Sequence, residues 1–156
     1  MTDTPQVILA AEIPSKKTTI YPEPFASMMN GREKRRLGDI FGIKKFGVNM
    51  TTLIPGARSA LLHKHSLQEE FIYILEGSVT LVTDLSEIEL KPGMCAGFTP
   101  SGTAHYLVNK TSKNVMYLEV GDRAHDDKVT YPADDLVAVS IGDNQWKFTH
   151  KDGRDY

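Results

Sequence analysis

The sequence has very little cysteine, with Cys95 alone among 156 residues. A framework of internal disulfides is therefore excluded, and the chain is compatible with a reducing compartment. No window approaches the ~18 apolar residues that a membrane helix needs. The N-terminal stretch carries an acidic residue where a secretory signal would be basic, and its apolar run covers only residues 7–11. We therefore expect a cytoplasmic protein with no membrane partner.

An excess of positive charge is also missing. The 18 basic and 20 acidic side chains give a net charge of −2, whereas nucleic-acid-binding proteins usually have a basic excess. The run Arg32 to Arg36, which includes Glu33, is the local exception. We interpret it as a solvated charged loop, and we expect no nucleic-acid partner.

The chain fits a single domain in which strands are short and helices are scarce. Glycines divide its centre into segments of strand length that are rich in Val, Ile, Thr, Tyr and Phe. This pattern predicts an all-β sandwich or barrel. A helical turn is expected only near residues 24–30. We divide the chain into an N-terminal arm at residues 1–40, a barrel at 41–121 and a C-terminal extension at 122–156, with both arms packing on the barrel or on a partner subunit. The expected strands cover residues 46–54, 59–65, 70–75, 78–83, 88–90, 105–109 and 115–120.

Four potential metal ligands lie in two of the strand-rich stretches. His63 and His65 are two residues apart, so in a strand their imidazoles point to the same face. Glu70 follows after a gap long enough for a turn and a return strand, and its carboxylate completes a set that leaves open positions on a metal ion. His105 begins a later strand and offers a third imidazole.

The surroundings of these residues resemble the two sequence motifs of the cupin family. The first is PGARSALLHKHSLQEEFIYILEG, from Pro55 to Gly77, and the second is PGMCAGFTPSGTAHYLVN, from Pro92 to Asn109. Two spacings depart from the pattern, with six residues between Gly56 and His63 and six between Gly93 and Pro100. Neither gap lies between ligands. The flanks are similar to those of small bacterial cupins labelled sugar-phosphate isomerase-like.

The resemblance implies a double-stranded β-helix, a jelly-roll barrel with irregular arms at both ends. It also implies one divalent transition metal ion (Fe, Mn, Ni, Co or Zn) bound by His63, His65, Glu70 and His105, and a homodimer with contacts at residues 7–9 and at the Tyr73 face. It selects Glu70 over Glu69. The alternation of Glu70 with Ile72 and Ile74 independently gives the same choice.

The expected function is that of a metal-dependent enzyme on a small oxygenated substrate, namely a sugar, a hydroxy-ketone or a carboxylate. Isomerase, lyase and dioxygenase chemistry stay open, and the alternative is a binding module that does not catalyse. The sequence does not identify a general base. Tyr117, Glu119 and residues 48–52 are candidates. Cys95 lies between apolar neighbours and is interpreted as a buried structural thiol, and Asn109 as a hydrogen-bonding residue.

Overall fold

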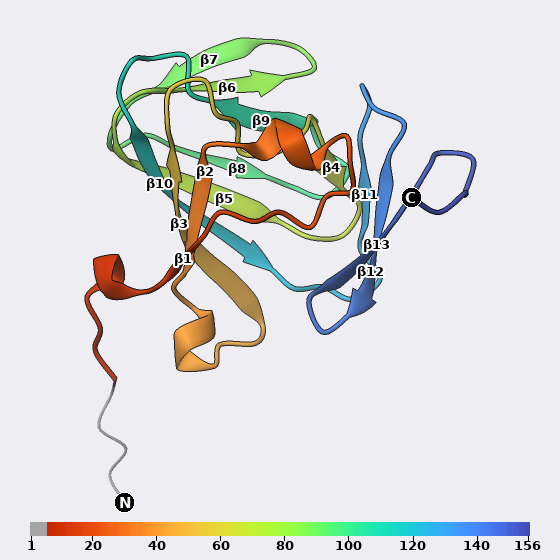
Figure 1. The fold of residues 1–156 in the computed structure, drawn as a ribbon, viewed down its shortest axis with the longest axis horizontal. Coiled ribbons are helices and arrows are strands. Elements are labelled where there is room, and N and C mark those ends of the chain that lie inside the picture. The colour runs from red at the N-terminus through yellow and green to blue at the C-terminus, as the bar shows by residue number, and fades with distance from the viewer. Residues whose placement is uncertain (1–5) are drawn as a thin grey trace, which may run out of the picture.

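The computed structural model describes residues 6–156. These residues form strands joined by loops and three short 3-10 helices, at Ala10–Glu12, Ala26–Met29 and Asp39–Phe41 (Figure 1). The all-β class is confirmed, and so is a helical turn near residues 24–30, but the 3-10 helices Ala10–Glu12 and Asp39–Phe41 were not expected. The strands are β1 (Ser15–Lys16), β2 (Arg32–Arg36), β3 (Phe46–Leu53), β4 (Lys64–His65), β5 (Glu70–Glu76), β6 (Val79–Thr83), β7 (Glu87–Leu90), β8 (Cys95–Phe98), β9 (His105–Val108), β10 (Val115–Asp122), β11 (Lys128–Thr130), β12 (Val137–Gly142) and β13 (Gln145–Thr149).

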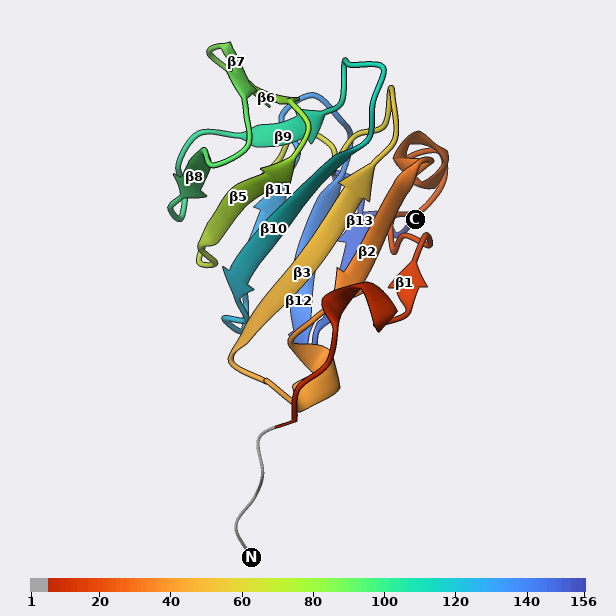
Figure 2. The ribbon, with the colours of Figure 1, turned by 90° about the vertical axis from the view of Figure 1, so that its left-hand side faces the viewer.

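The strands pair into three antiparallel sheets, which together form the wall of the barrel. The largest has the order β1-β2-β3-β10-β5-β8, and the others have the orders β13-β12-β11-β4 and β7-β6-β9. Figure 2 shows the large sheet in front of β11, β12 and β13, with β6, β7 and β9 at one end. The segment 122–156 thus supplies three strands to the wall opposite the large sheet, and β11 pairs with the short strand β4. The division at residues 40 and 121 stays a prediction.

Strand alternation decides which side chains of the large sheet enter the barrel. On β5, Ile72 and Ile74 are buried, whereas Phe71 and Tyr73 are 42% and 40% exposed. The predicted inward set of this strand is therefore confirmed. One apolar cluster fills the end of the barrel near β6, β7 and β9, and a second lies between β11, β12 and the segment at residues 25–29.

Two glycine turns hold the strands in register. Gly77, between β5 and β6, has a φ of +73°, and a Cβ atom there would lie 2.6 Å from the carbonyl oxygen of Asn114. Gly93, between β7 and β8, has a φ of +88° but open space around its Cα. Both are conformations that L side chains rarely adopt. Asn109 is fully buried, and its side-chain amide donates to the carbonyl oxygens of Leu53 and Lys113.

Several expectations about local structure were wrong. The basic run at 32–36 is strand β2 rather than a solvated loop, because it pairs along its length with β3. Cys95 is exposed, because its side chain lies on the outer face of the sheet beside Tyr73. Within residues 6–156, no helix has the length and apolar character needed to cross a bilayer.

Candidate metal centre

The two motif segments meet where strand β9 begins, at His105. Backbone hydrogen bonds join His63 and His105 in both directions, with N–O distances of 3.3 and 2.9 Å. His65 ends β4, and Glu70 begins β5 in the facing sheet. The local alternation of the His63–His65 segment turns both imidazoles to one side. Residues far apart in the chain therefore converge on one point inside the barrel.

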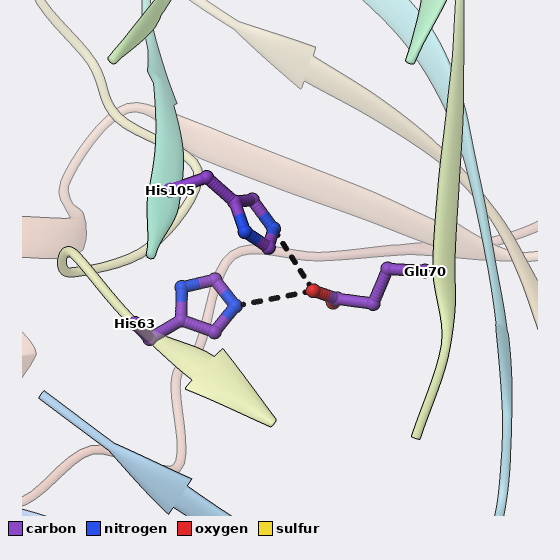
Figure 3. Close-up of side chains that lie close together, drawn as sticks. All are labelled: His63, Glu70 and His105. Carbon is purple, nitrogen blue, oxygen red and sulfur yellow. Dashed lines mark ion pairs between the residues drawn. The ribbon is translucent and has the colours of Figure 1, made fainter. Parts of the chain in front are cut away.

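Glu70 is the centre of the cluster. His63 Nε2 and His105 Nε2 lie 3.4 and 2.9 Å from Glu70 Oε2 (Figure 3). The potential ligand atoms of these three residues all lie within 4.8 Å of one another, so this group could hold a metal ion. His65 is outside that group, but its Nε2 lies 3.5 Å from the other carboxylate oxygen, Oε1. All four predicted residues are thus brought together, three of them in the tightest arrangement.

The opposite nitrogen of each imidazole is occupied by an acceptor. His63 Nδ1 lies 2.8 Å from the carbonyl oxygen of Leu61, and His105 Nδ1 lies 3.3 Å from that of Thr103. An Nδ1–H that donates to a carbonyl leaves the Nε2 lone pair facing Glu70. The ring of Phe98 stacks on His105 at a centroid distance of 3.4 Å and fixes its plane.

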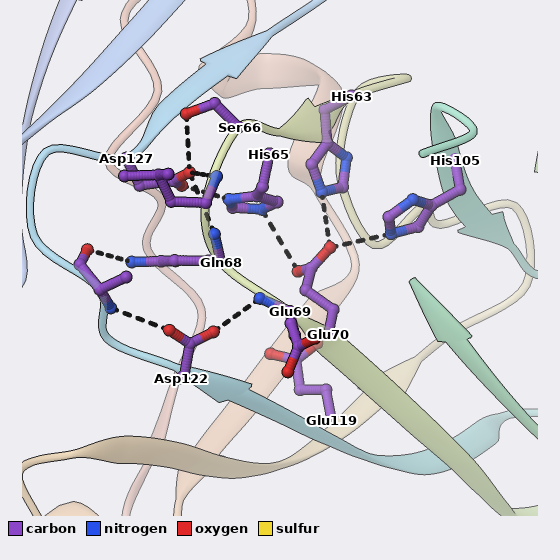
Figure 4. A network of polar contacts seen from close by, with 12 residues as sticks. His63, His65, Ser66, Gln68, Glu69, Glu70, His105, Glu119, Asp122 and Asp127 are labelled. Atoms are coloured by element: carbon purple, nitrogen blue, oxygen red, sulfur yellow. Dashed lines mark hydrogen bonds and ion pairs between the residues drawn. The ribbon is translucent and has the colours of Figure 1, made fainter. Parts of the chain in front are cut away.

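Asp127 holds His65 and is a functional residue that the sequence analysis missed. It is fully buried, and its Oδ2 lies 2.6 Å from His65 Nδ1. Its Oδ1 accepts hydrogen bonds from the backbone N–H groups of Leu67 and Gln68 at 2.7 and 3.2 Å and from the hydroxyl of Ser66 (Figure 4). Asp127 therefore orients one imidazole and shapes the loop that leads to Glu70. No local motif marks it, since it lies 62 residues from His65.

The donor set fits a divalent metal ion. Glu70 Oε2 is buried and accepts no hydrogen bond within the described chain. Imidazole lone pairs that approach a carboxylate oxygen this closely repel it unless a proton or a cation lies between them. Three imidazoles and one carboxylate, each imidazole oriented by a further acceptor, are typical of transition-metal sites in proteins.

The charges of the cluster are strongly coupled. Burial raises the pKa of Glu70, but the neighbouring His63 charge and the close contacts of the imidazoles outweigh burial and hold this pKa well below its usual range. Burial lowers the pKa of His65, but Glu70 and Asp127 outweigh it and raise the pKa to about 9. Burial is the main cause that lowers the pKa of His105. The carboxylate therefore stays ionised, as a metal ligand must be.

The cluster opens into a cavity of about 480 Å³ inside the barrel. Three of the candidate positions line this cavity, namely Asn49, Tyr117 and Glu119. Glu119 Oε1 accepts from Lys34 Nζ and, at 3.0 Å, from Asn49 Nδ2. Tyr117 is fully buried, and burial, followed by the charge of Glu119, raises its pKa well above the usual value. A phenol that holds its proton so firmly is a poor base. Gly121 pairs with Glu70 across the sheet and leaves the space beside the carboxylate free of a side chain.

Comparison with known proteins agrees with this geometry. The cupin domain family matches residues 49–121. A solved structure described as a sugar phosphate isomerase from a cupin superfamily, from Silicibacter pomeroyi, is 34% identical, covers 97% of this chain and 96% of that chain, and superposes with a TM-score of 0.90. A structure from Acidithiobacillus ferrooxidans, named as a candidate sugar phosphate isomerase, is 25% identical over 96% and 95% of the two chains, with a TM-score of 0.79.

A polyketide cyclase from Streptomyces resistomycificus shares the fold alone, at 24% identity over 76% of this chain and 80% of that chain, with a TM-score of 0.62. No protein of curated function matches the chain. The barrel, the positions of both motifs and the similarity along almost the whole length lead to one conclusion: the chain belongs to the cupin superfamily.

Proposed function

We propose that this protein is a metal-dependent isomerase of small hydroxy-carbonyl compounds, in which His63, His65, Glu70 and His105 bind one divalent transition metal ion. The observation that carries the proposal is the convergence of three imidazole Nε2 atoms on one carboxylate that lines the cavity. Iron, manganese, nickel, cobalt and zinc all accept this donor set. The names of the Silicibacter pomeroyi and Acidithiobacillus ferrooxidans structures support an isomerase rather than a lyase or a dioxygenase.

Isomerisation of a hydroxy-carbonyl compound needs an electrophile and a proton carrier. A bound divalent ion supplies Lewis-acid polarisation of the substrate oxygens. The protein must then remove a proton from the carbon next to the carbonyl group and return it to the former carbonyl carbon, while the hydroxyl proton moves to the former carbonyl oxygen. The base has to lie on the cavity wall within reach of a substrate bound beside Glu70.

Glu119 meets these requirements. Because Gly121 pairs with Glu70, Glu119 is the diagonal neighbour of Glu70 on the same face of the sheet, and such diagonal neighbours lie roughly 7–8 Å apart. Its side chain is 22% exposed and directed into the cavity. Lys34 and Asn49 both contact Oε1, so Oε2 is the atom that would carry the proton. The ion pair with Lys34 holds the carboxylate in place.

The test combines metal analysis with proton exchange. Protein purified without a tag is analysed for metal, reloaded with manganese, iron or zinc, and incubated in D₂O with aldoses, ketoses and their phosphates. We expect deuterium at the carbon next to the carbonyl group, detected by NMR, and loss of the exchange in Glu119→Gln. Glu69→Gln is the matched control, because Glu69 is adjacent to Glu70 but is exposed.

Each outcome has a distinct meaning. Unchanged exchange in Glu119→Gln contradicts the assignment of the base. Bound metal and bound sugar without exchange or turnover in the wild-type protein contradict the isomerase and favour the non-catalytic binding module.

A further inference from the structure

Strand alternation places the charged side chains of residues 32–36 on two opposite faces of β2. Arg32 and Lys34 lie on the cavity side of β2, opposite the buried positions Leu53 and Thr51 of β3. On the other face, Arg35 forms an ion pair with Glu33 at 3.0 Å. A run whose charges are mixed along the sequence therefore presents only its cations to the cavity.

The cavity is positively charged in a protein that is negatively charged overall. Five basic and three acidic side chains line it, although the whole chain has a net charge of −2. A divalent ion at the metal centre would increase this excess. A concave surface lined with one sign of charge attracts ligands of the opposite sign. The basic side chains are Lys16, Arg32, Lys34, Arg36 and Arg123, and the acidic ones are Glu70, Glu119 and Asp122.

Arg32 and Lys16 are the cations of this wall that no carboxylate in residues 6–156 neutralises, and of the two only Arg32 is half-buried, whereas Lys16 is exposed. Lys34 is paired with Glu119, and both Arg36 and Arg123 are paired with Asp39. Arg32 has no ion pair with any residue in the range 6–156.

The contacts of Arg32 use only a small part of its guanidinium group. Its Nη1 donates to the carbonyl oxygen of Ser59 and lies 3.7 Å from the sulfur of Met29. A guanidinium group has five N–H donors, so most of its donors remain available to a ligand.

We propose that Arg32 binds the phosphoryl group of a phosphorylated substrate, with Lys16 at the cavity rim as a second cation. This rests on the proposed function, because it names the substrate class of the same cavity. A phosphate monoester carries about two negative charges near pH 7, and the Lys and Arg side chains that line the cavity outnumber the acidic ones. The planar fork of Arg32 suits bidentate contact with phosphate oxygens.

The hydroxyl group of Tyr21 is a further donor in this part of the cavity. Burial raises the pKa of Tyr21, so its hydroxyl keeps its proton and can donate to a phosphate oxygen. Free inorganic phosphate shares the chemistry of the substrate phosphoryl group and is the simplest probe.

The experiment measures binding by calorimetry with chelator-treated protein, so that no metal ion competes for phosphate. The probes are inorganic phosphate, ribose 5-phosphate and ribose. We expect both phosphates to bind, and ribose to bind at least tenfold more weakly than ribose 5-phosphate. Loss of one charge-assisted contact predicts a fall in affinity of about 10- to 100-fold in Arg32→Gln.

Arg58→Gln is the matched control. Arg58 also has no carboxylate partner in the described chain, but it lies over the ring of Tyr106 at 4.9 Å and outside the cavity. Its substitution should leave phosphate affinity unchanged. Arg32→Lys keeps the positive charge but not the planar guanidinium group, so we expect a smaller loss of phosphate affinity than in Arg32→Gln. It also carries the test if the glutamine variant does not fold, as judged by circular dichroism.

Wild-type affinity in Arg32→Gln, or in Arg32→Lys if only that variant folds, would overturn the proposal. So would equal binding of ribose and ribose 5-phosphate. Failure of the isomerase is a separate result, because it is read from metal content and deuterium exchange. Metal-free protein that binds phosphate through Arg32 but shows no turnover when loaded would retain the phosphoryl site and contradict only the isomerase.

Discussion

The replacement Asp127→Asn should weaken metal binding without removing any of the four proposed ligands. The amide oxygen of asparagine can keep the place of Oδ1 and accept from the N–H groups of Leu67 and Gln68. The amide nitrogen then takes the place of Oδ2, where it meets His65 Nδ1 as donor to donor. The ring is expected to change tautomer, which puts the proton on Nε2 and removes the lone pair that would bind the ion.

The size of the effect follows from these contacts. Loss of an acceptor that orients a metal-binding histidine typically costs 10- to 100-fold in affinity. Exchange of a charged for a neutral acceptor weakens each remaining hydrogen bond by roughly half. We therefore expect the metal-free protein to lose about 1–3 kcal/mol of unfolding free energy. For a chain of this length, each kcal/mol corresponds to roughly 2–4 °C in Tm.

The assay measures zinc affinity by competition with a chromophoric chelator, together with urea and thermal unfolding of the metal-free protein. Asp126→Asn is the control, since Asp126 is the exposed neighbour and its φ of 61° is one that asparagine tolerates. If Asp127→Asn binds zinc as tightly as Asp126→Asn, Asp127 does not orient a ligand and the reasoning is refuted. Equal urea midpoints would likewise refute its role in holding the loop after His65.

Three further outcomes are expected. His63→Ala and His105→Ala should each lower metal content sharply by elemental analysis, whereas His150→Ala, at the end of the chain, should not; full occupancy in the first two would mean that the ligands are misassigned. Gly77→Ala should lose more unfolding free energy than Gly93→Ala, because both glycines have a positive φ but only Gly77 also lacks space for a Cβ atom. The backbone strain alone costs about 1–3 kcal/mol in either variant. Equal urea midpoints of the two variants would contradict this prediction. Finally, we expect a homodimer in light scattering at micromolar concentration, and a monomer would contradict the oligomeric state that the cupin resemblance implies.

The sequence predicted the parts of the fold and site that depend on local periodicity. The two-residue repeat of a strand put His63 and His65 on one face and separated Glu70 from Glu69, because alternation is a property of the backbone of each strand. Gly77 and Gly93 could be assigned to turns, since few other residues adopt their conformations. The apolar strands of the centre were identified because their side chains pack into the core.

The strands that the sequence analysis missed have weaker local patterns. The mixed charges of residues 32–36 concealed strand β2, because a charged run is also typical of a solvated loop. Exposure of Cys95 was likewise missed, because apolar neighbours in sequence do not show which face of a strand meets the core.

Tertiary structure alone decided the contacts on which the chemistry depends. Asp127 meets His65 only because β11 pairs with β4 across 62 residues, and no local pattern encodes that pairing. Arg32 faces the cavity only because β2 joins the edge of β3 and closes the wall. The sequence by itself determined which residues could bind a metal ion. The packing of distant strands determined which acceptors orient these ligands and which cations of the cavity wall stay unpaired, because both depend on the register between strands and not on the order of residues within one strand.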